Sequence, residues 1–239
     1  MRSKSSLVRI ASDKLIVALD LPDYDDARQL VETLGDTVSF YKIGLELLFS
    51  EGLPLASELK NEGKRVFLDM KFLDIGNTVE KAVAGVAGLG FDFLTIHGTD
   101  TKTMKAAVKG RGKSPLKILA VTVLTSLDQS DLNEQGIATS PRDLVLTRAK
   151  LARDAGVDGV IASGQEAAAI RAATGPDFLI VTPGIRLPGG GAGDQMRITT
   201  PEDAIRNGAN HIVVGRPINV ARNPVEAART YLEHLSRAV

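Results

Sequence analysis

The sequence predicts an α/β protein, a (β/α)8 or TIM barrel, from its strand pattern and its length. Eight short runs rich in Leu, Ile and Val alternate with stretches of helical composition along the whole chain. Nearly continuous apolar runs of this kind are typical of parallel strands that are covered on both faces. The length of 239 residues suits one such barrel, which we expect as a single domain over residues 1–239. A doubly wound open sheet is the alternative.

Each expected element can be placed along the chain. The strands are expected at Leu15–Leu19, Val38–Ile43, Val66–Met70, Phe93–Ile96, Ile118–Val123, Gly159–Ala162, Phe178–Val181 and His211–Val214. The clearest helices are expected at Asp25–Leu34, Thr78–Leu89, Pro141–Ala155, Gln165–Ala173, Pro201–Asn207 and Pro224–Leu235. They begin with a polar cap or a proline, or end near a glycine, as helices commonly do, and Asp23 is the expected N-cap of the first.

Composition excludes several classes of function. The chain has no cysteine, which removes disulfides, thiolate metal sites and cysteine nucleophiles, and suits a reducing, cytoplasmic location. Its 29 basic and 29 acidic residues balance, which argues against nucleic acid or an anionic membrane as a partner. No apolar run approaches the roughly 20 residues of a membrane span. Charges interrupt residues 1–13, so we expect a short N-terminal arm rather than a signal peptide.

Two long loops follow predicted strands, at residues 125–140 and 183–199, and the second contains a glycine-rich stretch. They could be inert connections. However, loops that follow barrel strands open onto the C-terminal rim, where barrel enzymes carry their chemistry. We therefore expect an active-site lid here.

The third predicted strand ends in an unusual pair of charges. Side chains alternate along a strand, so Asp69 and Lys71 share one face while Leu68 and Met70 take the other. A charge facing the interior of a barrel is costly unless it is paired. Asp74 lies five positions beyond Asp69 and belongs to the following loop. Taken alone, this segment could be a structural ion pair.

The neighbouring strands favour a catalytic interpretation. Lys42 lies near the end of the second predicted strand, before Gly44, and Asp20 ends the first. Because neighbouring strands lie about 4.8 Å apart, Lys42 can reach Asp69 and Lys71 at one level of the rim. Alternating lysines and aspartates hold one another ionised and in place, which is electrostatic preorganisation.

A phosphate site is expected beside this row. Gly215 and Arg216 end the eighth predicted strand, and barrels commonly bind phosphate at the loops after strands seven and eight. Gly215 lets the backbone approach a ligand, and Arg216 offers a bidentate fork. The glycine-rich loop opposite contains Arg186, Gln195 and Arg197.

The histidines predict no metal centre. His97, His211 and His234 are far apart in the chain, and no pair has the spacing of metal ligands. Solitary histidines are more often structural, so we expect no metal site at these three residues.

Taken together, these segments resemble the orotidine 5'-monophosphate decarboxylase family in its short, single-domain bacterial form. The resemblance covers nearly the whole chain, in the order of the family's motifs. The matching segments are Val17–Asp20, Lys42–Gly44, Asp69–Ile75, Asn77–Val79, Val121–Ser126, Val181–Arg186, Gly193–Gln195 and Val214–Pro217.

The resemblance implies a barrel that decarboxylates orotidine 5'-monophosphate to uridine 5'-monophosphate without a cofactor. Lys71 would donate the proton to the pyrimidine carbon that loses carbon dioxide. Asp69 would lie against the departing carboxylate and hold Lys71. Lys42 would complete the charged row and contact ribose, and Asp20 would be a ribose ligand.

The resemblance also implies a homodimer. Asp74, Ile75 and Thr78 would reach into the site of the neighbouring subunit. The family usually has proline where this chain has Gly76. The change could loosen the loop that carries Asp74, but it removes no functional group.

The remaining implied contacts are with the base and the phosphate. Thr125 would meet the edge of the pyrimidine. The phosphate clamp would consist of Arg186, Gln195, Gly215 and Arg216, with Gln195 able to bridge the phosphate and the base.

Two other functions stay open at this point. The first is a metal-assisted 3-keto-gulonate-6-phosphate decarboxylase or hexulose-phosphate synthase, which resembles the chain around Asp69–Asp74 and at Gly76. Such enzymes usually carry an acidic residue where Lys42 stands, and a lysine repels a divalent cation. The second is a silent barrel that only binds a nucleotide, which would show an intact phosphate clamp and a broken charged row.

Overall fold

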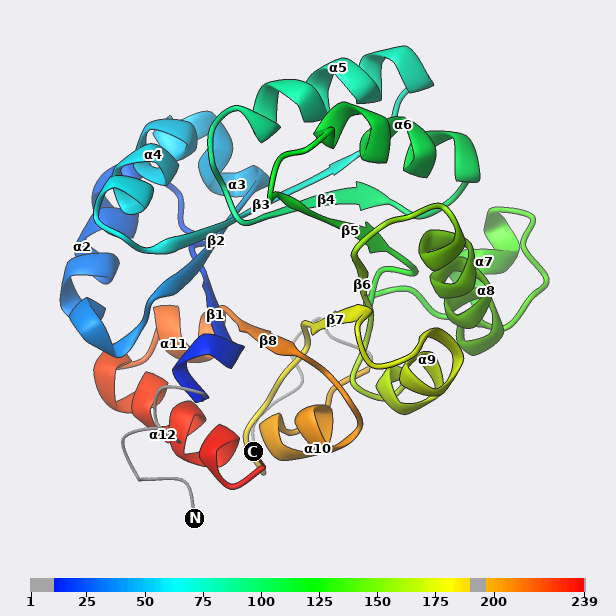
Figure 1. Ribbon diagram of the computed structural model, residues 1–239. Coiled ribbons are helices and arrows are strands. Elements are labelled where there is room, and N and C mark those ends of the chain that lie inside the picture. Colours follow the sequence, from blue (N-terminus) through cyan, green and yellow to red (C-terminus); the bar gives the residue numbers. More distant parts are fainter. Residues whose placement is uncertain (1–10, 190–196, 239) are drawn as a thin grey trace.

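The computed structural model describes residues 11–189 and 197–238, and it is a closed barrel of eight parallel strands inside a ring of helices (Figure 1). Neighbouring strands pair in chain order, and the first and last close the barrel through pairs such as Leu15 with Ile212. The predicted (β/α)8 barrel is therefore confirmed, and the open-sheet alternative is wrong. Among the described residues, no helix is long and apolar enough to cross a membrane.

All eight predicted strands form, with ends that differ by at most two residues. They are β1 Leu15–Ala18, β2 Phe40–Gly44, β3 Arg65–Phe72, β4 Phe93–His97, β5 Lys117–Val121, β6 Gly159–Ile161, β7 Leu179–Thr182 and β8 His211–Val214. The helices are α2 Tyr24–Leu34, η1 Gly35–Thr37, α3 Leu45–Leu47, η2 Leu48–Gly52, α4 Leu53–Asn61, α5 Gly76–Ala87, α6 Thr101–Arg111, α7 Gln129–Glu134, α8 Pro141–Asp154, α9 Ala167–Thr174, α10 Pro201–Arg206, α11 Arg216–Asn219 and α12 Pro224–Ser236.

Polar caps begin several helices. The Asp23 carboxylate accepts a hydrogen bond from the Asp26 amide at 2.9 Å, which confirms the predicted cap of α2. The loop expected over residues 125–140 contains a helix, α7, because Asp128 and Asp131 form a reciprocal capping box at its start.

The expectation of an N-terminal arm over residues 1–13 is wrong for residues 11–13. Residues 11–14 are helical and Ala11 is fully buried, so they belong to the packed fold. Residues 1–10 lie outside the described part of the chain.

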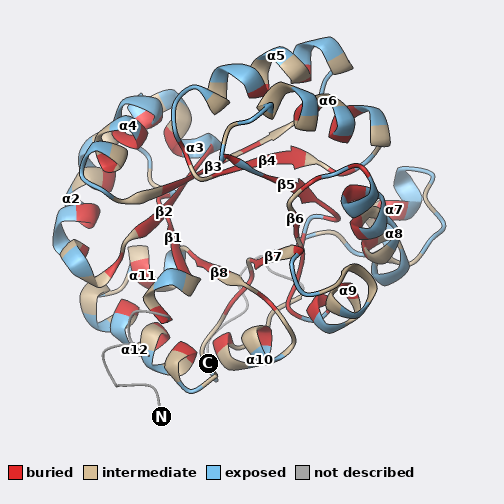
Figure 2. Cartoon of the chain, viewed as in Figure 1, coloured by how far each residue is buried: buried red, intermediate tan, exposed pale blue. Residues whose placement is uncertain are grey.

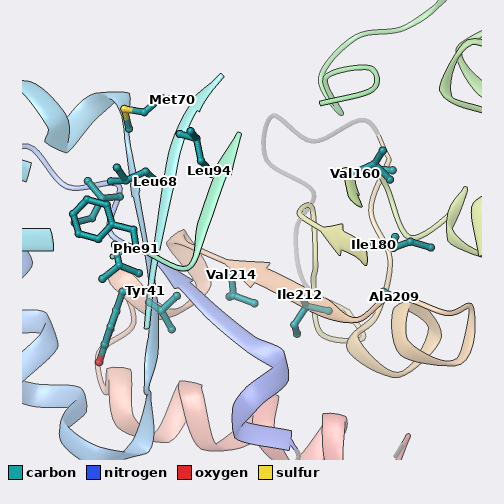
Figure 3. Packing of buried hydrophobic residues seen from close by; sticks show 14 of the residues in the cluster. Tyr41, Leu68, Met70, Phe91, Leu94, Val160, Ile180, Ala209, Ile212 and Val214 are labelled. Atoms are coloured by element: carbon teal, nitrogen blue, oxygen red, sulfur yellow. The ribbon is translucent and has the colours of Figure 1, made fainter. Parts of the chain in front are cut away.

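The alternation of side chains divides the buried residues into two groups. One group points outward from the strands and packs against the helices, and Figure 3 shows Tyr41, Leu68 and Val214 from this layer. The other group fills the inside of the barrel and consists of Ile16, Ala18, Phe40, Phe67, Phe93, Leu119, Val181 and Val213. Figure 2 shows that the strands are largely buried and that exposed residues lie mainly on the helices and loops. The inward-facing positions nearer the C-terminal ends of the strands than this apolar group form the site described below.

The same kind of polar contact links the N-terminal ends of three pairs of neighbouring strands. The side chain of the residue just before β4, β6 or β8 accepts a hydrogen bond at 2.9 Å from a backbone amide of the preceding strand, β3, β5 or β7. The same side chain also accepts one from a lysine or arginine in the helix that leads into β3, β5 or β7. The acceptors are Asp92, Asp158 and Asn210, and the cations are Lys60, Arg111 and Arg171.

His211 lies at this same end of the barrel and makes stability depend on pH. Its ring contacts Phe40 and Phe93 edge-on, and its Nδ1 lies 2.9 Å from the Asp13 carbonyl oxygen. Burial, with the positive charge of Arg65, lowers the pKa of His211 to about 4. Between pH 6.5 and about 4, His211 is protonated in the unfolded chain but stays neutral in the folded chain. The free energy of unfolding therefore decreases as the pH falls from about 6.5 towards 4.

We expect His211→Gln to reduce this dependence. Between pH 7 and pH 4.5, the wild type should lose about 2 kcal/mol more unfolding free energy than the variant, since a shift of one pKa unit is worth about 1.36 kcal/mol. Urea unfolding at several pH values measures the difference. Parallel curves of free energy against pH for the two proteins would contradict the prediction.

Candidate active site

A cavity of about 580 Å³ opens at the C-terminal ends of the strands. Its floor and walls include Phe67, Val121, Val123, Ile161 and Val213, so charges above them lie against an apolar surface. The predicted site residues that also line it are Asp20, Lys42, Asp69, Lys71, Thr125, Arg186, Gly215 and Arg216. The fold therefore brings both predicted clusters, the charged row and most of the phosphate clamp, to one cavity.

Four of these side chains form a continuous row of alternating charge. Lys42 Nζ lies 2.8 Å from Asp20 Oδ1 and 3.4 Å from Asp69 Oδ2. On the other side of Asp69, Lys71 Nζ lies 2.9 Å from Oδ1. The row arises because all four side chains occupy inward-facing positions on three neighbouring strands or just beyond them.

The row keeps its inner members ionised. Burial pushes the pKa of Asp69 up, but the Lys42 and Lys71 ammonium groups outweigh it and hold the pKa below its ordinary value. Burial likewise lowers the pKa of Lys42, but Asp69 and Asp20 outweigh it and raise that pKa. The site thus places a fixed carboxylate between two ammonium groups in an environment of low polarity, where charges interact strongly.

Gly44 leaves room for the Lys42–Asp20 ion pair of this row. A β-carbon there would lie 2.9 Å from Lys42 Nζ and 3.0 Å from Asp20 Oδ1. Any larger residue would have to push apart an ion pair of the row.

The backbone at Lys71 differs from the regular strand that was predicted. Leu68 pairs with Leu94, and Phe72 pairs with Ile96, so three residues of β3 stand opposite one residue of β4. Lys71 itself has a φ of 52°, in the left-handed region that residues with a β-carbon rarely adopt. Such strain persists only where the surrounding structure enforces it, and it concentrates at functional sites.

Thr95 is the residue of β4 opposite this bulge, and the sequence interpretation missed it. Its hydroxyl accepts a hydrogen bond from the Lys71 amide at 3.0 Å and donates one to Asp69 Oδ1 at 2.8 Å. The available signal was a single polar residue inside the apolar run of the fourth strand.

Three of the predicted phosphate residues, Arg186, Gly215 and Arg216, line the same cavity beside the charged row. Gly215 follows β8, and a β-carbon built on it would lie 3.7 Å from Asp20 Oδ2, so Gly215 adjoins the charged row. Arg216 begins α11, and Arg186 follows β7. Gln195 lies outside the described residues.

Asp74, Ile75 and Thr78 do not line the cavity of their own chain, as far as the described residues show. All three are exposed, and Asp74 Oδ1 accepts a hydrogen bond from the Ile75 amide at 2.6 Å. Gly76 is the first residue of α5, a position that also favours proline, which explains why either residue can stand there.

Arg197 does not join the phosphate cluster. Its guanidinium binds Glu166 Oε1 at 2.6 Å and the carbonyl oxygens of Val123 and Leu124 at 3.3 and 3.0 Å. It thereby ties the loops that follow β5, β6 and β7 together. Burial raises the pKa of Glu166 and Arg197 opposes this shift. The sequence could not reveal this pairing, because the two residues are 31 positions apart.

The histidines do not gather around a common centre. His97 ends β4, where burial and the Lys71 charge lower its pKa, while His211 lies at the opposite end of the barrel. His234 pairs with Glu202. Within the described ranges, no three His, Cys, Asp or Glu side chains form a group that could hold a metal ion.

Fold and site together define a (β/α)8-barrel enzyme with a row of paired lysines and aspartates in the cavity at the C-terminal ends of its strands. Residues 13–231 match the model of the Orotidine 5'-phosphate decarboxylase / HUMPS family. The chain belongs to this family.

Named relatives agree with this assignment. An orotidine 5'-phosphate decarboxylase of Caulobacter sp. (strain K31) is 56% identical over 218 residues, 91% of this chain and 95% of the relative. One from Rhodopseudomonas palustris (strain BisB5) is 53% identical over 226 residues, 95% and 96% of the two chains. The crystal structure of the orotidine 5'-phosphate decarboxylase from Lactobacillus acidophilus superposes with a TM-score of 0.81 at 37% identity, covering 93% of this chain and 99% of that one.

Proposed function

We propose that this chain decarboxylates orotidine 5'-monophosphate to uridine 5'-monophosphate, the final step of de novo pyrimidine nucleotide synthesis. The observation that carries the proposal is the row Asp20–Lys42–Asp69–Lys71 at the mouth of the barrel, next to Arg186 and Arg216. We place the reaction in the cytoplasm, because a cysteine-free chain suits a reducing compartment.

The row supplies the positive charge and the proton that this reaction requires. The bond between the pyrimidine ring and its carboxylate breaks, carbon dioxide leaves, and the electron pair stays on the ring carbon. The Lys71 ammonium stabilises this developing negative charge and then donates the proton that replaces the carboxylate. Asp69 lies against the departing carboxylate, where like charge disfavours the ground state. Lys42 and Asp20 hold the row and contact ribose.

The phosphate end supplies binding energy remote from the reacting bond. Arg186, Gln195, Gly215 and Arg216 hold the 5'-phosphate, and Thr125 meets the base. Energy from such a remote group can be used to align the substrate for reaction.

The metal-assisted alternative is not favoured. Lys42 forms ion pairs with both Asp20 and Asp69, so it neutralises the carboxylates that a divalent cation would need and repels the cation itself. A decarboxylation assay with orotidine 5'-monophosphate, with and without a chelator, tests the proposal. Turnover that is unaffected by the chelator supports it. Turnover abolished by the chelator indicates the metal-assisted class, and binding without turnover indicates a silent barrel.

We further propose a homodimer in which Asp74, Ile75 and Thr78 complete the partner's site. The segments that follow β2 and β3 start from neighbouring strands and expose large apolar side chains, including Phe49 in η2 at 88% and Ile75 before α5 at 73%. Exposed apolar surface of this kind commonly marks a protein interface. A second copy of the chain is the occupant that would bring Asp74 to a charged row.

A mixing experiment tests the shared site. Asp74→Asn and Lys71→Ala proteins should each be inactive, but their hybrid dimer contains one site with neither change. After exchange of subunits at equal concentrations, activity should rise to about a quarter of the wild-type value, because half of the dimers are hybrids with one intact site each.

The matched control mixes Lys42→Ala with Lys71→Ala, which lie in the same site of one subunit. This pair should stay inactive, because each site of the hybrid keeps one change. If hybrids of the first pair form and remain as inactive as the parents, Asp74 serves its own subunit.

A further inference from the structure

Thr95 contacts both reacting members of the charged row without lining the cavity. Its side chain is fully buried in β4. The hydroxyl accepts the Lys71 amide hydrogen at 3.0 Å and donates its own hydrogen to Asp69 Oδ1 at 2.8 Å. One hydroxyl group therefore fixes the backbone of the first residue and the carboxylate of the second.

The surrounding backbone explains why such a contact is needed. Asp69, Met70 and Lys71 stand together opposite Thr95, because the pairing of β3 with β4 skips from Leu68 to Phe72. Inside the bulge, the amide of Lys71 donates its hydrogen bond to a side chain of β4, the Thr95 hydroxyl. The left-handed conformation at Lys71 is also unfavourable for a residue with a β-carbon, so it must be held by its neighbours.

We propose that Thr95 is a positioning residue for the decarboxylation: its hydroxyl holds the Lys71 backbone and the Asp69 carboxylate in the one arrangement that sets Lys71 Nζ beside Asp69 Oδ1. The inference rests on the proposed function, in which Lys71 donates the proton. A catalytic group displaced by about 1 Å can cost about 100-fold in rate, so a residue that acts only through Lys71 and Asp69 can control turnover.

The test compares two substitutions at Thr95. Thr95→Val keeps the shape of the side chain and removes both hydrogen bonds, whereas Thr95→Ser keeps the hydroxyl. We expect Thr95→Val to lower kcat by about 10- to 150-fold, or about 1.4 to 3 kcal/mol at 1.36 kcal/mol per decade, which is the range for hydrogen bonds to charged groups. KM should change by less than about threefold, because the phosphate clamp is intact. Thr95→Ser should keep most of the wild-type kcat.

Thr122→Val is the matched control. Thr122 is also a buried threonine near the end of a barrel strand, and its hydroxyl donates to the Ile161 carbonyl oxygen at 2.9 Å instead of to the charged row. This variant should retain kcat. If Thr95→Val retains wild-type kcat, or if valine and serine at position 95 lower it equally, the proposal is overturned.

A second measurement does not depend on the substrate. Hydrogen exchange at the Lys71 amide, followed by NMR, should be faster in Thr95→Val than in the wild type and nearly unchanged in Thr95→Ser. Should Thr95→Val fail to fold, Thr95→Ala removes the same hydroxyl without adding a methyl group and serves for both measurements. Wild-type protein that does not decarboxylate the nucleotide contradicts the proposed function, while the exchange result still decides the role of Thr95. Unchanged exchange at Lys71 overturns that role.

Discussion

Replacing Lys71 with alanine should lower kcat by at least about 1,000-fold, because it removes the proposed proton donor, worth about 100- to 10,000-fold, together with the charge proposed to stabilise the carbanion. Among the described residues, Lys71 is the cavity-lining ammonium beside Asp69 on the side away from Lys42. Nucleotide binding should suffer much less than turnover, because Arg186 and Arg216 are unchanged. Single-turnover rates and calorimetric titration with uridine 5'-monophosphate separate the two effects.

Lys109→Ala is the control for this experiment. Lys109 is a largely exposed lysine on α6 that pairs with Glu80, and its loss should leave kcat unchanged. Retention of more than a few per cent of wild-type kcat by Lys71→Ala would remove Lys71 from the role of proton donor.

The second large effect is expected at the phosphate end of the cavity. Arg216 is exposed in the structure, and a bound nucleotide would bury its contact with the phosphate. A charge-assisted contact buried in this way is worth about 2–5 kcal/mol when it is truncated, so Arg216→Ala should lower kcat/KM for the nucleotide by roughly 30- to 5,000-fold. The same change should barely affect a nucleoside that lacks the phosphate. Steady-state kinetics with both substrates measure the difference.

Arg222→Ala provides the comparison for Arg216. Arg222 is an exposed arginine shortly after α11 that does not line the cavity, and we expect its kinetics to match the wild type. Equal losses for the nucleotide and the nucleoside in Arg216→Ala would show that Arg216 is structural or touches the base.

Much of the site could be predicted because its positions follow local rules. Side chains alternate along a strand, so Asp69 and Lys71 could be assigned to one face from their spacing alone. Asp20 and Gly215 end apolar runs and Lys42 lies near the end of another, and the ends of parallel strands meet at one edge of a barrel. Once eight alternating units are recognised, these separate segments must converge. The structure confirms that convergence at a single cavity.

Other features depend on contacts between distant segments and could not be predicted from local patterns. The helix α7 was assigned to a loop, because its capping box spans only a few residues in a polar stretch. Arg197 was grouped with the phosphate residues, because nothing near it in the chain reveals that it lies against Glu166.

The sequence by itself determined the barrel, the row of alternating charges and the rim on which it lies, because strand period, strand ends and residue type are local properties. Only the tertiary structure decided how Lys71 is held. The bulge in β3 exists because of its register with β4, and the hydroxyl that fixes it comes from Thr95, 24 residues further along the chain. Hydrogen bonds between strands depend on distance in space, and a residue's neighbours in the sequence do not reveal them.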